Sequence, residues 1–96
     1  MARILVICWQ EIPSSVEVRD AGQTHKIQLS QRFMELIDMI AMRRKLSVTD
    51  DYLMQWRKEK RPDRAGAGAD VARAVADEFE ARYEEIRDAA IAAAPG

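Results

Sequence analysis

One continuous apolar run constrains the fold of this chain more than any other feature of its sequence. Residues 4–9 read Ile-Leu-Val-Ile-Cys-Trp, so both faces of an extended segment are apolar here. A strand that is apolar on both faces is typical of the interior of a sheet. Pro13 has no backbone N–H to donate, so the strand should end or bend near residues 11–13. The run therefore predicts an inner β-strand with a turn directly after it.

Two segments that alternate apolar and polar residues follow this turn. Val16 and Val18 share one face of the first segment, and Ile27 and Leu29 share one face of the second. Residues 21–23, Ala-Gly-Gln, have the length and the glycine of a hairpin turn. We predict a β-hairpin paired with the first strand, in a small, mostly antiparallel sheet of about three strands.

The middle of the chain predicts two helices. Ser30 is a favourable N-cap residue, and apolar residues recur behind it at helical spacing. Residues 43–45 are all cations, which suit a helix C-terminus. Residues 47–50, Ser-Val-Thr-Asp, match a capping box, which predicts a second, shorter helix ending near Lys60.

The last third of the chain predicts a linker and a third helix. Residues 61–69 contain a proline, two glycines and no large apolar residue, as in a linker. Residues 70–93 carry an apolar helical stripe. The predicted fold is α+β: about three strands packed against two to three helices, with a core domain over 1–60. The amphipathic C-terminal segment, 70–96, is expected to belong to the same domain or to form an interface.

Composition excludes several classes of protein. Ninety-six residues suit one domain, and a net charge of −1 gives no overall attraction to nucleic acid or anionic lipid. The single cysteine cannot form an internal disulfide, which favours a reducing compartment. The N-terminal apolar run is shorter than the roughly 7–15 residues of a signal peptide. No segment approaches the roughly 18 apolar residues that span a bilayer. We expect a cytoplasmic protein that does not enter a membrane.

The sequence offers little for catalysis. Cys8, Glu11 and His25 are the only set that resembles a nucleophile, a base and an orienting group. Cys8, however, lies inside an apolar run, where thiols are usually inert, and His25 shares a face with apolar neighbours, as a structural histidine does. No histidine pair, paired cysteines or calcium-loop spacing indicates a metal, and the glycines of 65–69 follow no predicted strand. We expect no catalytic residue, no metal and no cofactor.

One basic segment of the sequence has two interpretations. Residues 57–64 carry five cations and two anions, and Tyr52 and Trp56 lie nearby. Basic segments with interleaved aromatics can bind single-stranded nucleic acid. Both aromatic residues fall on the helix face that should be buried, so the other interpretation is a solvated helix end that leads into the linker.

Four short motifs follow one another along the chain. The first is Trp9, Ile12 and Pro13, with Gln10 and Glu11 between them. The other three are a Leu-x-x-Arg-Phe helix start, an Ile-Asp…Ala-Met-Arg helix and a Tyr-Leu…Trp segment. They are carried by Leu29, Arg32 and Phe33, by Ile37, Asp38, Ala41, Met42 and Arg43, and by Tyr52, Leu53 and Trp56. In this order, the motifs resemble a small bacterial domain family labelled virulence factor, over about residues 2–60. That family typically has an aromatic–Trp–Arg–Asp–Ile–Pro stretch, in which Gln10 and Glu11 replace the usual Arg and Asp.

The resemblance implies a function by association. Similar small proteins are encoded, in some bacteria, beside methylenetetrahydrofolate reductase-like and corrinoid methyltransferase proteins, which implies an accessory subunit in one-carbon metabolism. We expect a non-enzymatic accessory protein that binds a protein partner, in a hetero- or homo-oligomer. The alternative is a small nucleic-acid-binding or regulatory protein that uses residues 57–64, and an enzyme is the third interpretation.

Eight residues are candidates for contact with a partner. The first strand has a second apolar face that needs a cover, because leaving it wet forfeits roughly 1.5–3 kcal/mol per large side chain. One turn carboxylate should face solvent, two methionines lie off the apolar face of their helix, and two aromatic residues belong to the C-terminal helix. The candidates are Leu5, Ile7, Trp9, Glu11, Met39, Met42, Phe79 and Tyr83.

Overall fold

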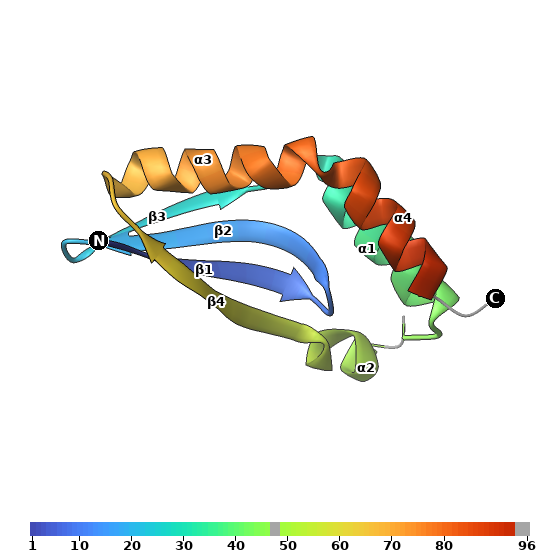
Figure 1. Cartoon of the computed structure of the whole chain (residues 1–96). Helices are drawn as coiled ribbons and strands as arrows, with labels where there is room; N and C mark the ends of the chain where they lie inside the picture. The colour runs from blue at the N-terminus through green and yellow to red at the C-terminus, as the bar shows by residue number, and fades with distance from the viewer. Residues whose placement is uncertain (47–48, 94–96) are drawn as a thin grey trace.

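The structure, a computed structural model, describes residues 1–46 and 49–93 and has the predicted α+β architecture (Figure 1). The described part contains four strands and four helices, somewhat more of each than the sequence predicts. In chain order these are β1 Ala2–Trp9, β2 Ile12–Asp20, β3 Gln23–Gln28, α1 Gln31–Arg43, α2 Thr49–Met54, β4 Trp56–Arg64, α3 Gly68–Ala81 and α4 Tyr83–Ala93.

The four strands form one antiparallel sheet in the order β3-β2-β1-β4. The apolar run of β1 is an inner strand, as predicted, and the hairpin of β2 and β3 lies on one side of it. Ala21 and Gly22 have φ angles of 50° and 80°, which suit the tight turn of a two-residue hairpin. Val6 pairs with Val16, which pairs with Ile27, so the apolar positions of three strands share one face.

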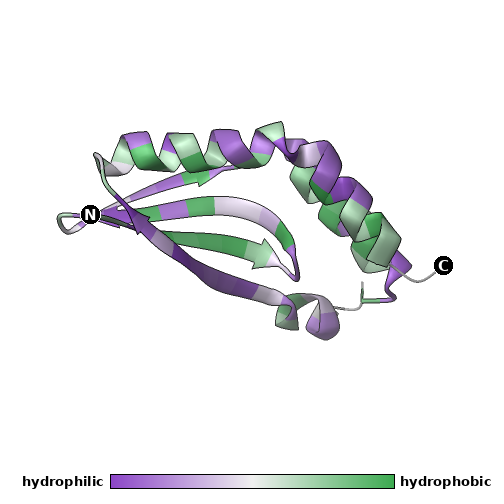
Figure 2. Cartoon of the chain, in the orientation of Figure 1, coloured by the Kyte–Doolittle hydropathy of each residue, from purple (hydrophilic) through white to green (hydrophobic). Residues whose placement is uncertain are grey.

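The prediction of a helix continuing to about Lys60 is wrong. Helix α2 ends at Met54, and residues 56–64 form the edge strand β4, in which Glu59 pairs with Val6 and Arg57 with Cys8. Only residues 65–67 of the expected linker lie outside regular structure. Figure 2 shows β4 as almost continuously hydrophilic, so it lacks the alternation that identifies a strand. Charged side chains on an edge strand also oppose pairing with other chains.

The C-terminal helix is two helices rather than the single one predicted. Helix α3 crosses one face of the sheet and packs on β2 and β3. The helix is interrupted at Arg82, where the chain changes direction, and α4 packs beside α1 (Figure 1). Tyr83, the first residue of α4, meets Phe33 of α1 edge to face at 5.1 Å between ring centroids.

A polar junction fixes α1 to the end of α3. Ser30 occupies the N-cap position of α1, as predicted, but its side chain does not cap the helix. Instead its backbone N–H and its Oγ donate to the two carboxylate oxygens of Glu80, at 2.7 and 2.8 Å. Arg32 donates from Nη2 to the carbonyl oxygen of Glu80 at 2.8 Å, and its guanidinium lies 4.3 Å from the Tyr83 ring centroid. The capping-box residues 47 and 48 lie outside the described residues.

Candidate binding surfaces

One face of the sheet carries no helix in the part of the chain that the structure describes. The face under α3 buries Ala2, Ile4, Val6 and Cys8 of β1. The alternate residues Leu5 and Ile7 point to the opposite side and are half-buried. Residues paired directly across an antiparallel sheet share a face. Leu5 and Ile7 therefore form the centre of the open side, which we call the open face.

The open face is strongly basic although the whole chain is not. Among the residues that the strand register pairs, Arg3, Arg19, Lys26, Lys58 and Lys60 lie on it, with Glu17 as their one anion. Five cations and one anion give this face a charge of +4, against −1 for the chain. Arg19 and Lys58 lie 3.2 and 3.8 Å from Glu17, which neutralises part of that charge. A hollow of about 30 Å³ gathers Arg3, Arg19 and Lys60 around Leu5.

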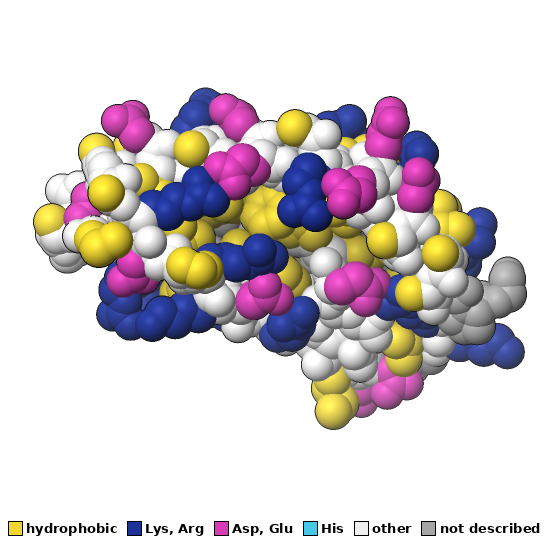
Figure 3. All heavy atoms as spheres, in the orientation of Figure 1, with side chains coloured by type: hydrophobic (Ala, Val, Ile, Leu, Met, Phe, Trp, Pro, Cys, Tyr) yellow, Lys and Arg dark blue, Asp and Glu magenta, His cyan; other side chains and the backbone are white. Residues whose placement is uncertain are grey.

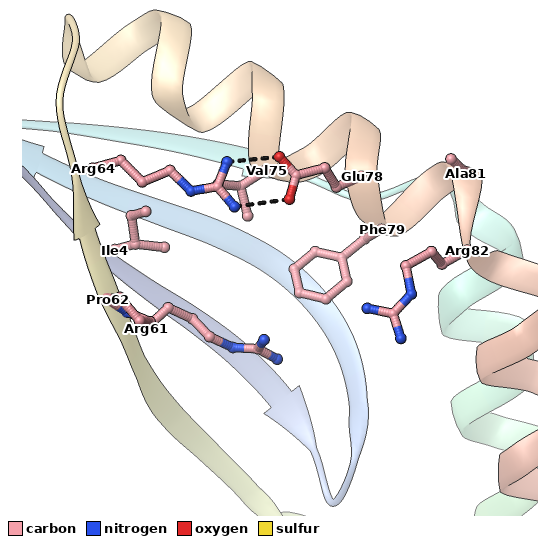
Figure 4. Close-up of a pocket in the computed structure, with 9 residues that line it drawn as sticks. All are labelled: Ile4, Arg61, Pro62, Arg64, Val75, Glu78, Phe79, Ala81 and Arg82. Atoms are coloured by element: carbon pink, nitrogen blue, oxygen red, sulfur yellow. Dashed lines mark hydrogen bonds and ion pairs between the residues drawn. The ribbon is translucent and has the colours of Figure 1, made fainter.

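A larger groove lies on the other side of the sheet, between β4 and α3. Its volume is about 480 Å³, and Figure 3 shows hydrophobic side chains in the hollow with basic and acidic side chains at its border. Ile4, Val75 and Phe79 supply its apolar surface, and Arg61, Arg64 and Arg82 supply cations (Figure 4). The groove exists because β4 directs charged side chains toward the helix layer, so α3 cannot close over it.

Ion pairs define the rim of this groove. Arg64 donates from Nη1 and Nη2 to the two carboxylate oxygens of Glu78, at 2.6 and 2.8 Å, and this bond lowers the pKa of Glu78 (Figure 4). Arg82 bonds to Glu85 through Nε and Nη2. The guanidinium of Arg61 lies 5.5 Å from the Phe79 ring centroid. Its Nε is enclosed and has no hydrogen-bond partner among the described residues, although Glu59 Oε1 is 2.8 Å away.

The eight predicted partner-contact residues do not form one surface. Leu5 and Ile7 lie on the open face, and Phe79 lies in the groove. Glu11 is exposed in the β1–β2 turn but forms an ion pair of 2.7 Å with Arg44. Trp9 is fully buried, Met39 and Tyr83 are half-buried against the core, and Met42 is 70% exposed on α1.

The burial of Trp9 has a structural cause. Its Nε1 donates to the carbonyl oxygen of Tyr52 at 3.0 Å, and the two ring centroids lie 5.7 Å apart. Tyr52 also meets Trp56 edge to face. The first and fourth family-like motifs therefore pack against each other, which joins the end of β1 to α2 and the start of β4.

The structure does not bring Cys8, Glu11 and His25 together as a reactive group. Cys8 is buried under the helices, and this burial raises the pKa of its thiol from 9.0 to about 11. Glu11 binds Arg44, and His25 packs against the backbone of Gly68. Residues 1–46 and 49–93 contain no group of three His, Cys, Asp or Glu residues arranged to hold a metal ion. In the same residues, no helix combines the length and the apolar character needed to cross a membrane.

The sequence alone does not show that the arginines of the groove belong to one site. Arg61 and Arg64 belong to the basic segment 57–64, which the sequence predicts as a helix end leading into a linker or, in the alternative, as a nucleic-acid-binding segment. As a strand, this segment sends Lys58 and Lys60 to the open face and Arg61 to the groove. The cluster of cations was the available signal, but its division between two surfaces depends on the strand register.

The fold and its two surfaces define a small α+β domain with a four-stranded antiparallel sheet, open on one face and grooved on the other. The chain belongs to the virulence factor family, because a sequence model of that family matches residues 7–91. The match begins at residue 7, continues past residue 60 through α3 and ends at residue 91 within α4. A search of curated proteins and a search of solved structures each found no match.

Proposed function

We propose that this chain is a non-enzymatic accessory protein that binds an acidic partner protein on its open face. The observation that carries the proposal is the +4 charge around Leu5 and Ile7 on the side of the sheet that none of the described helices covers. An apolar centre with a charged rim is the usual anatomy of a protein interface. A basic surface favours acidic partners by steering their approach.

The family resemblance and the side chains of the open face together indicate which kind of partner to test first. The resemblance to the family points to enzymes of folate and corrinoid one-carbon metabolism as partners to test first. Binding of single-stranded nucleic acid is the second candidate function, and the five cations favour it. Proteins that grip single strands stack bases on aromatic side chains. The register continues the open face to Trp9 and Trp56, but Trp9 is fully buried and Trp56 is half-buried against Tyr52. Among the described residues, the open face therefore presents no exposed aromatic ring for base stacking, which favours a protein partner.

Charge reversal on β4 tests the proposal. The variant Lys58→Glu, Lys60→Glu changes the open face from +4 to 0 and removes only exposed side chains. The variant Arg43→Glu, Arg73→Glu makes the same change in net charge at exposed helix positions. Both variants and the wild type would be used to capture folate and corrinoid enzymes from the native host, with bound proteins and nucleic acid quantified.

We expect the wild type and the helix variant to retain the same acidic enzyme, with retention falling as salt rises. The β4 variant should lose at least about 90% of it, since reversing interfacial charges commonly changes affinity tenfold or more. Equal retention by all three proteins would contradict the proposal. Salt-dependent retention of RNA or DNA in place of a protein would support the second function.

A further inference from the structure

We infer that the groove between β4 and α3 binds a small amphiphilic carboxylate, a molecule with an apolar body and one anionic head. The groove lies on the opposite side of the sheet from the open face, so this inference does not depend on the proposed function.

The apolar lining of the groove would contact the apolar body of the ligand. Ile4, Val75 and Phe79 are each at least 90% buried, yet they line a space of about 480 Å³. Sites for small molecules commonly have about 300–1,000 Å³ and a mainly apolar lining with few polar groups. An alkyl chain or a ring against the Phe79 face would remove this remaining apolar surface from water.

The arginines of the groove would bind the anionic head of the ligand. Arg61 and Arg82 both extend toward the space beside Phe79, from opposite walls of the groove (Figure 4). Among the described residues, no hydrogen bond uses the two terminal nitrogens of Arg61 or the Nη1 of Arg82. Three arginines (61, 64 and 82) and one glutamate (78) line the groove, whereas Glu59 and Glu85, which pair with Arg61 and Arg82, lie outside the lining. The lining itself therefore carries a charge of +2. One carboxylate would offset part of it with charge-assisted hydrogen bonds.

The shape of the groove favours a small molecule over a peptide segment. The Arg64–Glu78 pair joins β4 to α3 with two short hydrogen bonds, so it connects the two walls. Arg82 extends into the groove from the end of α3. An extended peptide would need a continuous passage between the walls, whereas a compact ligand fits between these two features.

Octanoate is a suitable probe, and 1-octanol is its neutral counterpart of the same chain length. Amide NMR spectra of the ¹⁵N-labelled full chain would be followed as each compound is added to millimolar concentration. Three proteins would be compared: the wild type, Arg61→Gln with Arg82→Gln, and Arg3→Gln with Arg19→Gln. The last pair loses the same charge from the open face and serves as the matched control.

We expect octanoate to shift amide resonances of residues 61, 63, 64 and 75–82 in the wild type and the open-face variant. Its Kd should rise about tenfold or more in the groove variant, because hydrogen bonds to charged groups contribute that much. Octanol should bind the wild type about as weakly as octanoate binds the groove variant. Absence of shifts, shifts centred elsewhere, equal affinity in the groove variant or equal binding of octanol would each overturn the inference.

Discussion

Replacing Ala72 by aspartate is expected to unfold this protein, whereas the same change at Ala74 should leave it folded. Ala72 is fully buried in α3, which packs on β2 and β3, and Ala74 is exposed two residues later on the same helix. The buried position offers neither room for a larger side chain nor a partner for its charge. The cost should be at least about 3 kcal/mol, a large part of the roughly 5–14 kcal/mol typical of a chain this long.

Thermal unfolding followed by circular dichroism tests this pair. Ala72→Asp should lower the melting temperature by at least about 12 °C or abolish the transition, given a shift of about 4–8 °C per kcal/mol. Ala74→Asp should melt within a few degrees of the wild type. Similar melting of the two variants would show that α3 does not contribute its apolar face to the core of the domain.

Replacing Trp9 by alanine should produce the second-largest loss of stability, about 3–5 kcal/mol. Trp9 is fully buried, so its removal leaves a cavity and deprives the Tyr52 carbonyl of its donor. Trp9→Phe should cost less than Trp9→Ala, because a phenyl ring fills most of the space but cannot donate the hydrogen bond. Denaturant titration gives both free energies of unfolding.

Trp56 provides the control for this substitution. It is half-buried and meets the Tyr52 ring edge to face. Trp56→Ala should therefore cost clearly less than Trp9→Ala. If the order were reversed, the junction of α2 with the sheet would depend on β4 rather than on the end of β1.

The inner strand, the hairpin and α1 could be predicted because the apolar residues of each follow the pattern of its buried side chains. Residues 4–9 are apolar on both faces of β1. Ile4, Val6 and Cys8 are buried under the helices, and Leu5 and Ile7 are half-buried between the side chains of β2 and β4. β4 could not be predicted in this way. Its backbone pairs with β1, but its side chains border solvent on one face and the groove on the other, so no apolar alternation is required.

The break between α3 and α4 could not be predicted from the sequence pattern either. The helical apolar spacing continues through Arg82, and no proline or glycine interrupts it. The break is accompanied by contacts with α1: Glu80 bonds to Ser30, and Tyr83 packs on Phe33. Tertiary contacts of this kind leave no signal in a local window. The candidate residues on β1 were found from their alternation, whereas the arginines of the groove depend on how β4 and α3 are arranged.

The central claim, that the open face binds the partner, is tested most directly by the affinity of the variant Leu5→Thr, Ile7→Thr. These changes remove the apolar centre, place a β-branched residue suited to a strand at each position and leave the +4 charge intact. The affinity for the acidic enzyme retained by the wild type would be measured by calorimetry, after circular dichroism has established that the variant is folded. The account predicts a folded variant that binds at least about tenfold more weakly, because central apolar residues carry much of an interface's energy. A folded variant with unchanged affinity would contradict it.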